Sequence, residues 1–360
     1  MIKKLTTVSN ENINNIFENY SHLLTHSVNT HFIKTLYHLI KRYHYKKEEF
    51  ALTTETPNVS SRYMAPTISQ FIKTHLFNCY TMRFSMQNTN VNLTIYSVHP
   101  IVVQNYLFYI KLVLHICLQS ASKKHHEIHF KIILTDIPKT CPTIPVEPAH
   151  INSGQSDPNK NEIMIFRKEE WLKVFIHECF HLFCLDFCDL DITYTGMFKD
   201  LYNIESEFLL FEAYTEFWAR TINLSIVSYY TAPTMTLKNF EKLVTINIQV
   251  ERLFCMAQMN HLLHRMGLTY ESLFQDLKLR EKTNFFCYYV LTSVLFYNYN
   301  DTMLWCMNNN TNLLQFSNQN VSLFFDFIKQ RHRAPEFLAF IKQINHPLHN
   351  CNMAAFDILF

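Results

Sequence analysis

Glycine is nearly absent from this sequence. Only three of the 360 residues are glycine, and they are widely separated, at Gly154, Gly196 and Gly267. Neither a GxGxxG dinucleotide-binding loop nor a Walker phosphate-binding loop can be written with them, because both patterns need closely spaced glycines. The sequence therefore excludes the protein classes that hold a nucleotide in a glycine-rich loop.

A strong excess of charge and long apolar segments are also missing. The formal net charge is +2, which produces no field that would attract nucleic acid or an anionic membrane. The most apolar stretches are residues 101–118, which polar side chains interrupt, and residues 285–297, which are too short to cross a bilayer. The first eleven residues contain no apolar core of a signal peptide. We therefore expect no nucleic-acid partner, no membrane span and a cytoplasmic location.

The cysteines of this sequence do not indicate a secreted protein. The ten cysteines are scattered along the chain, and hydrophobic residues make up 48% of it. Without a secretory signal, scattered cysteines indicate reduced thiols, most of them in a large core.

The spacing of apolar residues predicts strands in the first half of the chain and mainly helices in the second. Period-two alternation across Asn88 and Asn90 predicts a β-hairpin, and two more strands follow. The expected strands are 80–86, 92–97, 129–135 and 162–166. Helical periodicity occupies other segments, and a polar break spans residues 53–62. The expected helices are two within 12–45, then 67–77, 100–120, 203–226, 237–266, 270–300 and 320–343.

This order of elements favours an α+β fold of two lobes. The N-terminal lobe is expected to hold a small mixed β-sheet, and the C-terminal lobe to be mainly helical. The expected regions are a helical segment over residues 1–78, a lobe of sheet and one central helix over residues 79–190, and a helical lobe over residues 191–360.

One apolar run contains a motif with metal chemistry. Residues 171–185 lack glycine and proline, so a helix is expected, and they include the HExxH sequence His177-Glu-Cys-Phe-His181. On a helix, His177 and His181 lie one turn apart on the same face, where two imidazoles can bind one zinc ion. Glu178 lies beside them, where a carboxylate can accept a proton from metal-bound water. The alternative is a histidine pair on a half-buried helix, satisfied by backbone groups or water.

Catalytic zinc usually has three protein ligands, so another ligand is expected downstream. The extension HExxHxxGxxH does not apply, because Cys184 and Phe187 stand where its glycine and third histidine would be. A second helical run instead carries Glu212 and Glu216 on one face. Glu212 can reach the metal, and Glu216 can accept the free ring N–H of a histidine ligand. The alternative is that both carboxylates face solvent.

Other side chains near these helices are further candidates. Cys184 and Cys188 continue the stripe of the two histidines, although small apolar residues beneath the helix are the favoured interpretation. Three aspartates could supply an oxygen ligand, but solvation in a polar loop is favoured for them: Asp186, Asp189 and Asp191. A donor to a developing oxyanion is also needed. Its candidates lie in the helical lobe: Tyr229, Tyr230, His261 and His264.

The two glutamate-containing motifs together resemble those of the zincin metallopeptidases. His177-Glu-Cys-Phe-His181 followed by Glu212-Ala-Tyr-Thr-Glu216 is most similar to the gluzincin branch, which includes thermolysin-like enzymes and related aminopeptidases. The resemblance implies a zincin-like fold and one zinc ion bound by His177, His181 and Glu212. It also implies that the strand 162–166 is the edge strand that pairs with an extended substrate, through Ile163, Met164 and Ile165.

Some features of that family are missing here. The glycines and the asparagine common near its third ligand are absent, and the exopeptidase signature of the aminopeptidases is not present. The segment from Asn152 to Glu178 also resembles metallopeptidases predicted in large DNA viruses.

The activity implied is zinc-dependent hydrolysis of peptide bonds in a protein or peptide substrate. Glu178 is the general base that acts on a metal-activated water. The alternatives are a catalytically silent zincin-like interaction module and a helical protein without metal. The presence of Glu178 favours the enzyme, because a pseudoenzyme often loses its base while its fold persists.

Overall fold

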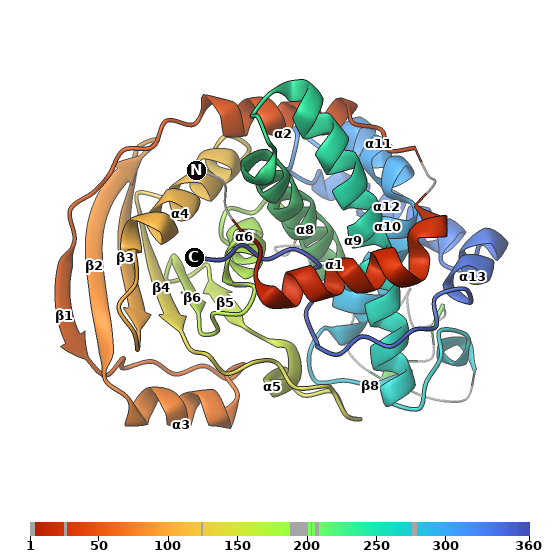
Figure 1. The fold of residues 1–360 in the computed structure, drawn as a ribbon, viewed down its shortest axis with the longest axis horizontal. Coiled ribbons are helices and arrows are strands. Elements are labelled where there is room, and N and C mark those ends of the chain that lie inside the picture. Colours follow the sequence, from red (N-terminus) through yellow and green to blue (C-terminus); the bar gives the residue numbers. More distant parts are fainter. Residues whose placement is uncertain are drawn as a thin grey trace.

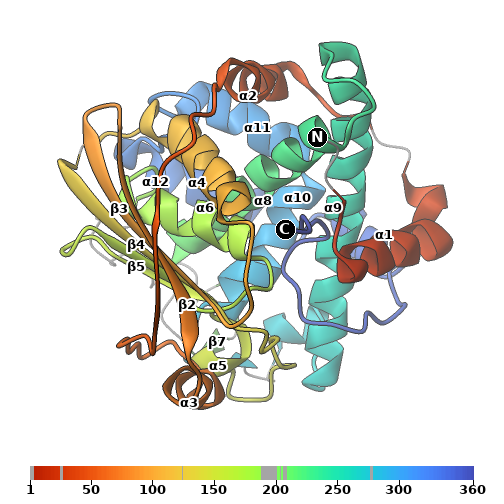
Figure 2. The ribbon, with the colours of Figure 1, turned by 60° about the vertical axis from the view of Figure 1, so that its left-hand side comes forward.

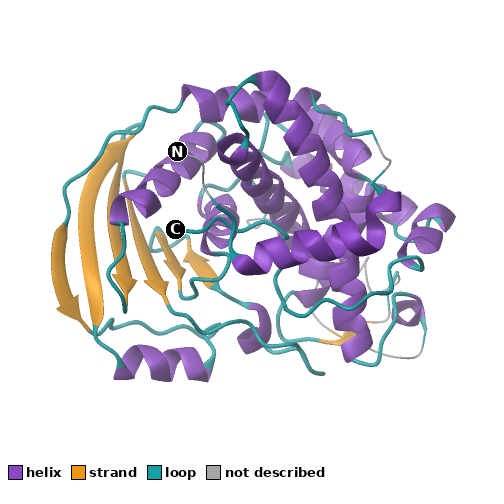
Figure 3. Cartoon of the chain, viewed as in Figure 1, coloured by secondary structure: helices purple, strands orange, loops and turns teal. Residues whose placement is uncertain are grey.

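The chain folds into a sheet region and a helical region that pack side by side (Figure 1, Figure 3). The structure is a computed structural model, and it describes residues 4–24, 27–123, 125–187, 201–202, 204–205, 209–275 and 279–360. A six-stranded mixed sheet lies on one side, and helices from both ends of the chain form the other. The expected α+β class is therefore confirmed.

The six strands follow the spatial order β1-β2-β3-β4-β6-β5. They are β1 (Ala51–Glu55), β2 (Phe77–Met86), β3 (Thr89–Ser97), β4 (Glu127–Leu134), β5 (Gly154–Asp157) and β6 (Glu162–Ile165). The central pairs β3–β4 and β4–β6 are parallel, and the outer pairs are antiparallel. Gln87 and Asn88 join β2 to β3 with φ angles of 46° and 67°, as a two-residue type I′ turn requires. The predicted hairpin is therefore confirmed.

Helices pack on both faces of the sheet, and the helix on the second face lies at one end of the strands, as Figure 2 shows. α4 (Val103–Leu118) and α6 (Trp171–Leu182) pack against one face, and α3 (Pro66–Thr74) packs against the other. Side chains along each strand alternate between the two sides. In β6, for example, Ile163 and Ile165 join the larger core with α4 and α6, whereas Met164 joins the smaller core with α3.

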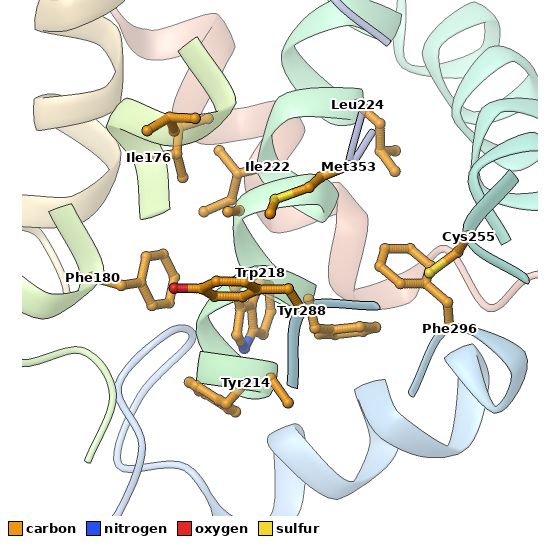
Figure 4. Close-up of a cluster of buried hydrophobic side chains, with 14 of the residues drawn as sticks. Ile176, Phe180, Tyr214, Trp218, Ile222, Leu224, Cys255, Tyr288, Phe296 and Met353 are labelled. Carbon is orange, nitrogen blue, oxygen red and sulfur yellow. The ribbon is translucent and has the colours of Figure 1, made fainter. Parts of the chain in front are cut away.

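The helical region is built around α8, which is buried along nearly its whole length. Its neighbours are α6, α9, α2 and α10. Figure 4 shows Tyr214, Trp218 and Ile222 of α8 meeting Ile176 and Phe180 of α6 in one apolar cluster. The helices of this region are α1 (Thr7–Tyr20), α2 (His31–Arg42), α8 (Leu210–Thr231), α9 (Leu237–Arg265), α10 (Thr292–Tyr297), α11 (Tyr299–Asn309), α12 (Val321–Arg331) and α13 (Pro335–Ile341).

Several short elements connect the longer ones. They are η1 (Ser21–Leu23), α5 (Pro148–Ile151), β7 (Ile204–Glu205), η3 (Glu271–Phe274), β8 (Leu279–Arg280), the π-helical segment η4 (Phe286–Leu291) and η5 (Asn318–Asn320). None of the helices in the described ranges is both long enough and apolar enough to cross a membrane.

Several parts of the predicted secondary structure were wrong, including the single helix expected over 320–343, which is divided into α12 and α13. The polar break 53–62 begins inside β1, whose five side chains are all exposed, so that the strand has no apolar alternation to detect. The single helix expected over 270–300 is divided into η3, β8, η4, α10 and α11. The expected region 1–78 is also divided, because α1 and α2 pack on helices of the second half whereas β1 and α3 belong to the sheet.

The C-terminal segment, residues 350–360, returns to the middle of the molecule (Figure 1). Cys351, Met353 and Phe356 are buried there. Glu170, which directly precedes α6, accepts hydrogen bonds from the backbone N–H groups of Met353 and Ala354 at 3.0 and 2.7 Å. The last residues of the chain therefore help to position the start of α6.

Asp357 makes the stability of this C-terminal segment depend on pH. Burial, together with the charge of Glu170, raises the pKa of Asp357 from 3.8 to about 7, and Glu169 adds to this while Lys139 opposes it. The folded chain therefore binds this proton more tightly than the unfolded chain does. The resulting stabilisation is fully present below about pH 4 and is lost as the pH rises through 7.

We expect Asp357→Asn to flatten this pH dependence. The amide oxygen can still accept the hydrogen bond from the Glu170 N–H, which is 3.3 Å from Asp357 Oδ2, but the side chain no longer titrates. Between pH 5 and 7, the free energy of unfolding of the wild type should fall relative to the variant by up to about 1.4 kcal/mol per pH unit. Urea unfolding at several pH values measures the difference. Parallel pH profiles for the two proteins would contradict the assignment.

Candidate metal centre

The HExxH helix is confirmed, and its C-terminal end shapes the site. α6 ends at Leu182, and Cys184 then adopts a left-handed backbone conformation with φ of 49°. The Leu185 N–H donates to the Phe180 carbonyl at 2.9 Å and the Cys184 N–H to the His181 carbonyl at 3.2 Å. These are the two hydrogen bonds of a Schellman motif, which reverses the direction of the chain. Cys184 therefore does not continue the helical stripe of the two histidines.

Three buried side chains from α6 and α8 converge on one point. His177 Nε2 lies 3.1 Å from His181 Nε2 and 3.1 Å from Glu212 Oε2, and His181 Nε2 lies 3.3 Å from the same carboxylate oxygen. Four tetrahedral ligands about 2.0–2.1 Å from a zinc ion are about 3.3–3.4 Å from one another. The three side chains therefore have the spacing of a group that could bind one metal ion.

The hydrogen bonds behind the histidines set their tautomers. His177 Nδ1 lies 3.1 Å from Glu216 Oε2, and His181 Nδ1 lies 2.5 Å from Asp186 Oδ2. In the neutral tautomer that directs its ring N–H at the carboxylate behind it, each histidine presents the Nε2 lone pair to Glu212. Three acceptor atoms so close together need a positive charge between them, which a proton or a metal ion can supply.

The pKa values agree with such a negatively charged centre. Burial raises the pKa of Glu212, but His181 and His177 outweigh this effect and lower it to about 2. Burial lowers the pKa of His177, but hydrogen bonds to Glu212 and Glu216 outweigh this effect and raise it. Glu212 is therefore ionised, and its negative charge attracts cations to the site.

Glu216 is held in place by two buried cations. Lys173 Nζ lies 3.0 and 3.1 Å from its two oxygens, and Arg220 Nε lies 2.9 Å from Oε1. Burial raises the pKa of Glu216, but Lys173, His177 and Arg220 together outweigh this effect, so that the pKa is well below its usual value. The carboxylate is therefore ionised and oriented, as an acceptor for His177 should be. The alternative of solvent-facing glutamates was wrong, because Glu212 and Glu216 are 7% and 0% exposed.

Asp186 is the hydrogen-bond partner of His181, although its sequence context favoured a solvent-exposed position. It is 3% exposed, and besides His181 it binds the Thr215 hydroxyl of α8 at 2.9 Å. The Schellman turn folds the chain back after α6 and brings Asp186 against His181. The solvated interpretation of Asp186 was therefore wrong. Cys188, Asp189 and Asp191 lie outside the described residues.

Glu178 lies in the wall of a cavity of about 300 Å³ that also contains the three converging side chains. Burial raises the pKa of Glu178, and the neighbouring histidines and a hydrogen bond from Ser156 oppose this effect. A carboxylate with a raised pKa is suited to accept a proton near neutral pH. Glu178 therefore lies beside the three converging side chains, as the predicted role of general base requires.

Two residues of this cavity were not anticipated. Tyr288 and Asn284 line it from the segment around η4. The Asn284 amide donates to Glu212 Oε1 at 2.9 Å, which leaves Oε2 facing the histidines. The Tyr288 ring lies 5.5 Å from the His177 ring, and Figure 4 shows it directed towards α6. In the sequence, both residues lie in the apolar stretch 270–300. Its helical pattern does not distinguish residues that line a cavity from residues of the core.

The predicted oxyanion donors lie elsewhere. Tyr229 and Tyr230 stand at the far end of α8 and pack on aromatic rings of α2 and α4. His261 and His264 line a separate cavity of about 330 Å³. Among the residues that the structure describes, none of these four lines the cavity of the converging side chains.

The predicted edge strand was also wrong. β6, which carries Ile163, Met164 and Ile165, pairs with β4 on one side and β5 on the other, and all three side chains are buried. β5 occupies the sheet edge and borders the cavity through Gly154, Gln155 and Ser156. The sequence analysis predicted one strand in this region, but the structure has two. β5 was not predicted because its residues show no alternation of apolar and polar side chains.

Glycine is required where β5 approaches α6. A Cβ atom on Gly154 would lie 2.8 Å from Val174 Cγ1 of α6 and 2.8 Å from Ile165 Cδ1. Both distances are shorter than packed carbon atoms tolerate. One of the three glycines of the chain therefore allows the edge strand to lie directly beside the HExxH helix.

Comparison with known proteins assigns no family to this chain. No protein-family model matches it, and no curated protein or solved structure is significantly similar to it. Function must therefore be inferred from the geometry and chemistry of the site.

The convergent geometry predicts that Glu212→Gln weakens metal binding. The amide has the same shape but no charge, so it cannot compensate the ion as the carboxylate does. We expect the purified wild type to bind one zinc ion per chain and the variant to bind it at least about 100-fold more weakly, since losing even an outer hydrogen-bond partner typically costs 10–100-fold. Competition with a chromogenic chelator measures the affinity. The matched control is Glu18→Gln on the exposed face of α1, and equal affinities for all three proteins would refute the site.

Proposed function

We propose that this chain is a zinc-dependent metallopeptidase of the zincin type, with His177, His181 and Glu212 as zinc ligands and Glu178 as general base. The observation that carries the proposal is the convergence of two imidazole Nε2 atoms and one carboxylate oxygen beside Glu178. Two histidines and one glutamate are a donor set of hydrolytic zinc sites, which keep a further position for water.

The surroundings of the site also support a zincin-like arrangement. A mixed sheet ends in an edge strand next to the HExxH helix, and the third ligand comes from the next long helix, α8. Each histidine donates to a carboxylate, an arrangement that orients imidazole ligands and raises their basicity. This combination is the one that the resemblance to the gluzincin branch implies.

The reaction follows from the groups that face the cavity. Zinc bound here would lower the pKa of its water and polarise the scissile carbonyl. Glu178 accepts the proton of the attacking water and returns it to the leaving amine. Burial raises the pKa of Tyr288 well above its usual value, so the phenol stays protonated. Tyr288 can thus donate a hydrogen bond to the carbonyl oxygen as negative charge develops on it.

An extended peptide is the substrate that the walls of the cavity accommodate. Within the described residues, β5 pairs with no strand except β6. Its other edge borders the cavity, where a peptide can add as a further strand. A peptide bound in this way would lie next to Glu178.

Replacing the base tests the reaction itself. We expect Glu178→Gln to bind zinc as the wild type does, because the residue is not a ligand, and to cleave peptides about 10²–10⁴-fold more slowly, because it cannot take up the proton. Turnover of a fluorogenic library of mixed peptides and the zinc content of the same samples are the two measurements. Glu336→Gln, on the exposed face of α13, should leave both unchanged.

The outcomes separate the candidate functions. Cleavage that persists in Glu178→Gln would refute the mechanism. A wild-type protein that holds zinc but cleaves no peptide would instead identify a catalytically silent zincin-like interaction module.

Replacing Tyr288 by Phe tests the proposed oxyanion donor. The change removes only the hydroxyl group, so we expect kcat to fall about 10²–10³-fold while KM and zinc affinity stay nearly constant. Steady-state kinetics on one peptide from the cleaved set measures both constants. Tyr230→Phe, which lies outside the cavity, is the matched control. A change in KM alone would assign Tyr288 to substrate binding.

A further inference from the structure

Two cysteines far apart in the sequence meet near the start of α6. Cys141 and Cys351 are 210 residues apart, and their sulfur atoms are 2.9 Å apart. Both are free thiols. The S–S distance of a disulfide is about 2.05 Å, so an approach of about 0.9 Å would suffice to bond them. The two side chains therefore already point at each other.

The segments that carry the two sulfurs are held by the same carboxylate. Glu170 accepts hydrogen bonds from the N–H groups of Met353 and Ala354, and its carboxylate pairs with the ammonium group of Lys139. Cys351 is two residues from the first of these contacts, and Cys141 is two residues from Lys139. A bond between the sulfurs would therefore join covalently two segments that Glu170 already joins by charge and hydrogen bonds.

Both segments have additional contacts that keep the sulfurs in place. The Cys351 carbonyl accepts from the Tyr289 hydroxyl at 3.0 Å, and the preceding Asn350 carbonyl accepts from Gln258 at 2.8 Å. In the loop before α5, the Lys139 N–H donates to Glu169 at 2.9 Å. The meeting of the two thiols is therefore a property of a fixed part of the fold.

The two thiols differ in their access to solvent. Cys141 is half-buried, whereas Cys351 is only 4% exposed. Burial also raises the pKa of Cys351. An oxidant from solution therefore reaches Cys141 first, and Cys351 is placed to resolve the product.

We propose that Cys141 and Cys351 form a redox-active pair that a peroxide converts into a disulfide. The thiolate of Cys141 attacks one oxygen of hydrogen peroxide, which breaks the O–O bond and yields a sulfenic acid and, after proton uptake, water. The Cys351 sulfur then attacks the sulfenic sulfur, the S–S bond forms, and a second water leaves. Two thiols are oxidised by two electrons in total, and one peroxide is reduced to two waters.

The disulfide fastens the C-terminal segment to the loop before α5. Met353 of that segment lines a small cavity together with His177 and Glu178, and its sulfur lies 3.1 Å from Lys173 Nζ. Because a crosslink between residues so distant in sequence strongly restricts the unfolded chain, the oxidised protein should be more stable and should retain its C-terminal segment more firmly. The proposal requires neither zinc nor peptidase activity, so it can fail or succeed independently of them.

The experiment uses the full chain, reduced and then treated with a small excess of hydrogen peroxide. Remaining thiols are alkylated, and peptides are mapped by mass spectrometry without reduction. We expect one linked pair of peptides that contain Cys141 and Cys351, and a rise in Tm of at least about 3 °C. Dithiothreitol should reverse both changes.

Single substitutions distinguish this pair from general thiol oxidation. Cys141→Ser should lose the linked peptides and the rise in Tm, whereas Cys184→Ser, the other half-buried cysteine among the described residues, should keep both. In Cys351→Ser, Cys141 should stop at the sulfenic acid, which dimedone labels. Alkylation of both Cys141 and Cys351 in the peroxide-treated wild type, or a link from either one to another cysteine, would overturn the proposal.

Discussion

The contact between α6 and α8 depends on the pairing of charges that have no access to water. Lys173 and His177 of α6 meet Glu216 and Arg220 of α8, and the side chains of all four are at most 7% exposed. Each buried ion costs several kcal/mol of desolvation, and that cost is offset only when its partner is in hydrogen-bond geometry. The pairing of these charges therefore favours the observed register of the two helices. In that register His177, His181 and Glu212 converge, so the same interaction aligns the core and the candidate metal centre.

The two histidines are oriented by different kinds of support. Glu216, behind His177, binds two cations, whereas Asp186, behind His181, accepts a hydrogen bond from the neutral hydroxyl of Thr215 in addition to contacting the imidazole. Positive charge around Glu216 compensates its carboxylate and limits how much negative charge it can lend to His177. The two histidines of the motif are therefore held by carboxylates with different surroundings.

Parts of the chain distant in sequence complete the site. β5 borders the cavity before the HExxH helix begins, η4 contributes Tyr288 from the second half, and the last residues bring Met353 and support Glu170. The π-helical turn of η4 adds one residue to the normal helical repeat, which changes the direction in which its side chains project, and such turns are frequent at functional sites. Glu170 links the C-terminal segment to the loop of Cys141, so the start of α6 is supported from both sides.

The sequence by itself determined the α+β class, the β2–β3 hairpin, the HExxH helix and the pairing of Glu212 with Glu216 on one helical face. These features follow from local periodicity and turn chemistry, which a contiguous stretch of residues contains completely. Only the tertiary structure decided which strand forms the sheet edge, that Asp186 is buried, and that Asn284, Tyr288 and Met353 surround the site. Each of these depends on contacts between residues far apart in the chain. Burial and hydrogen bonding across such contacts are set by packing, and no local pattern of polar and apolar residues records them.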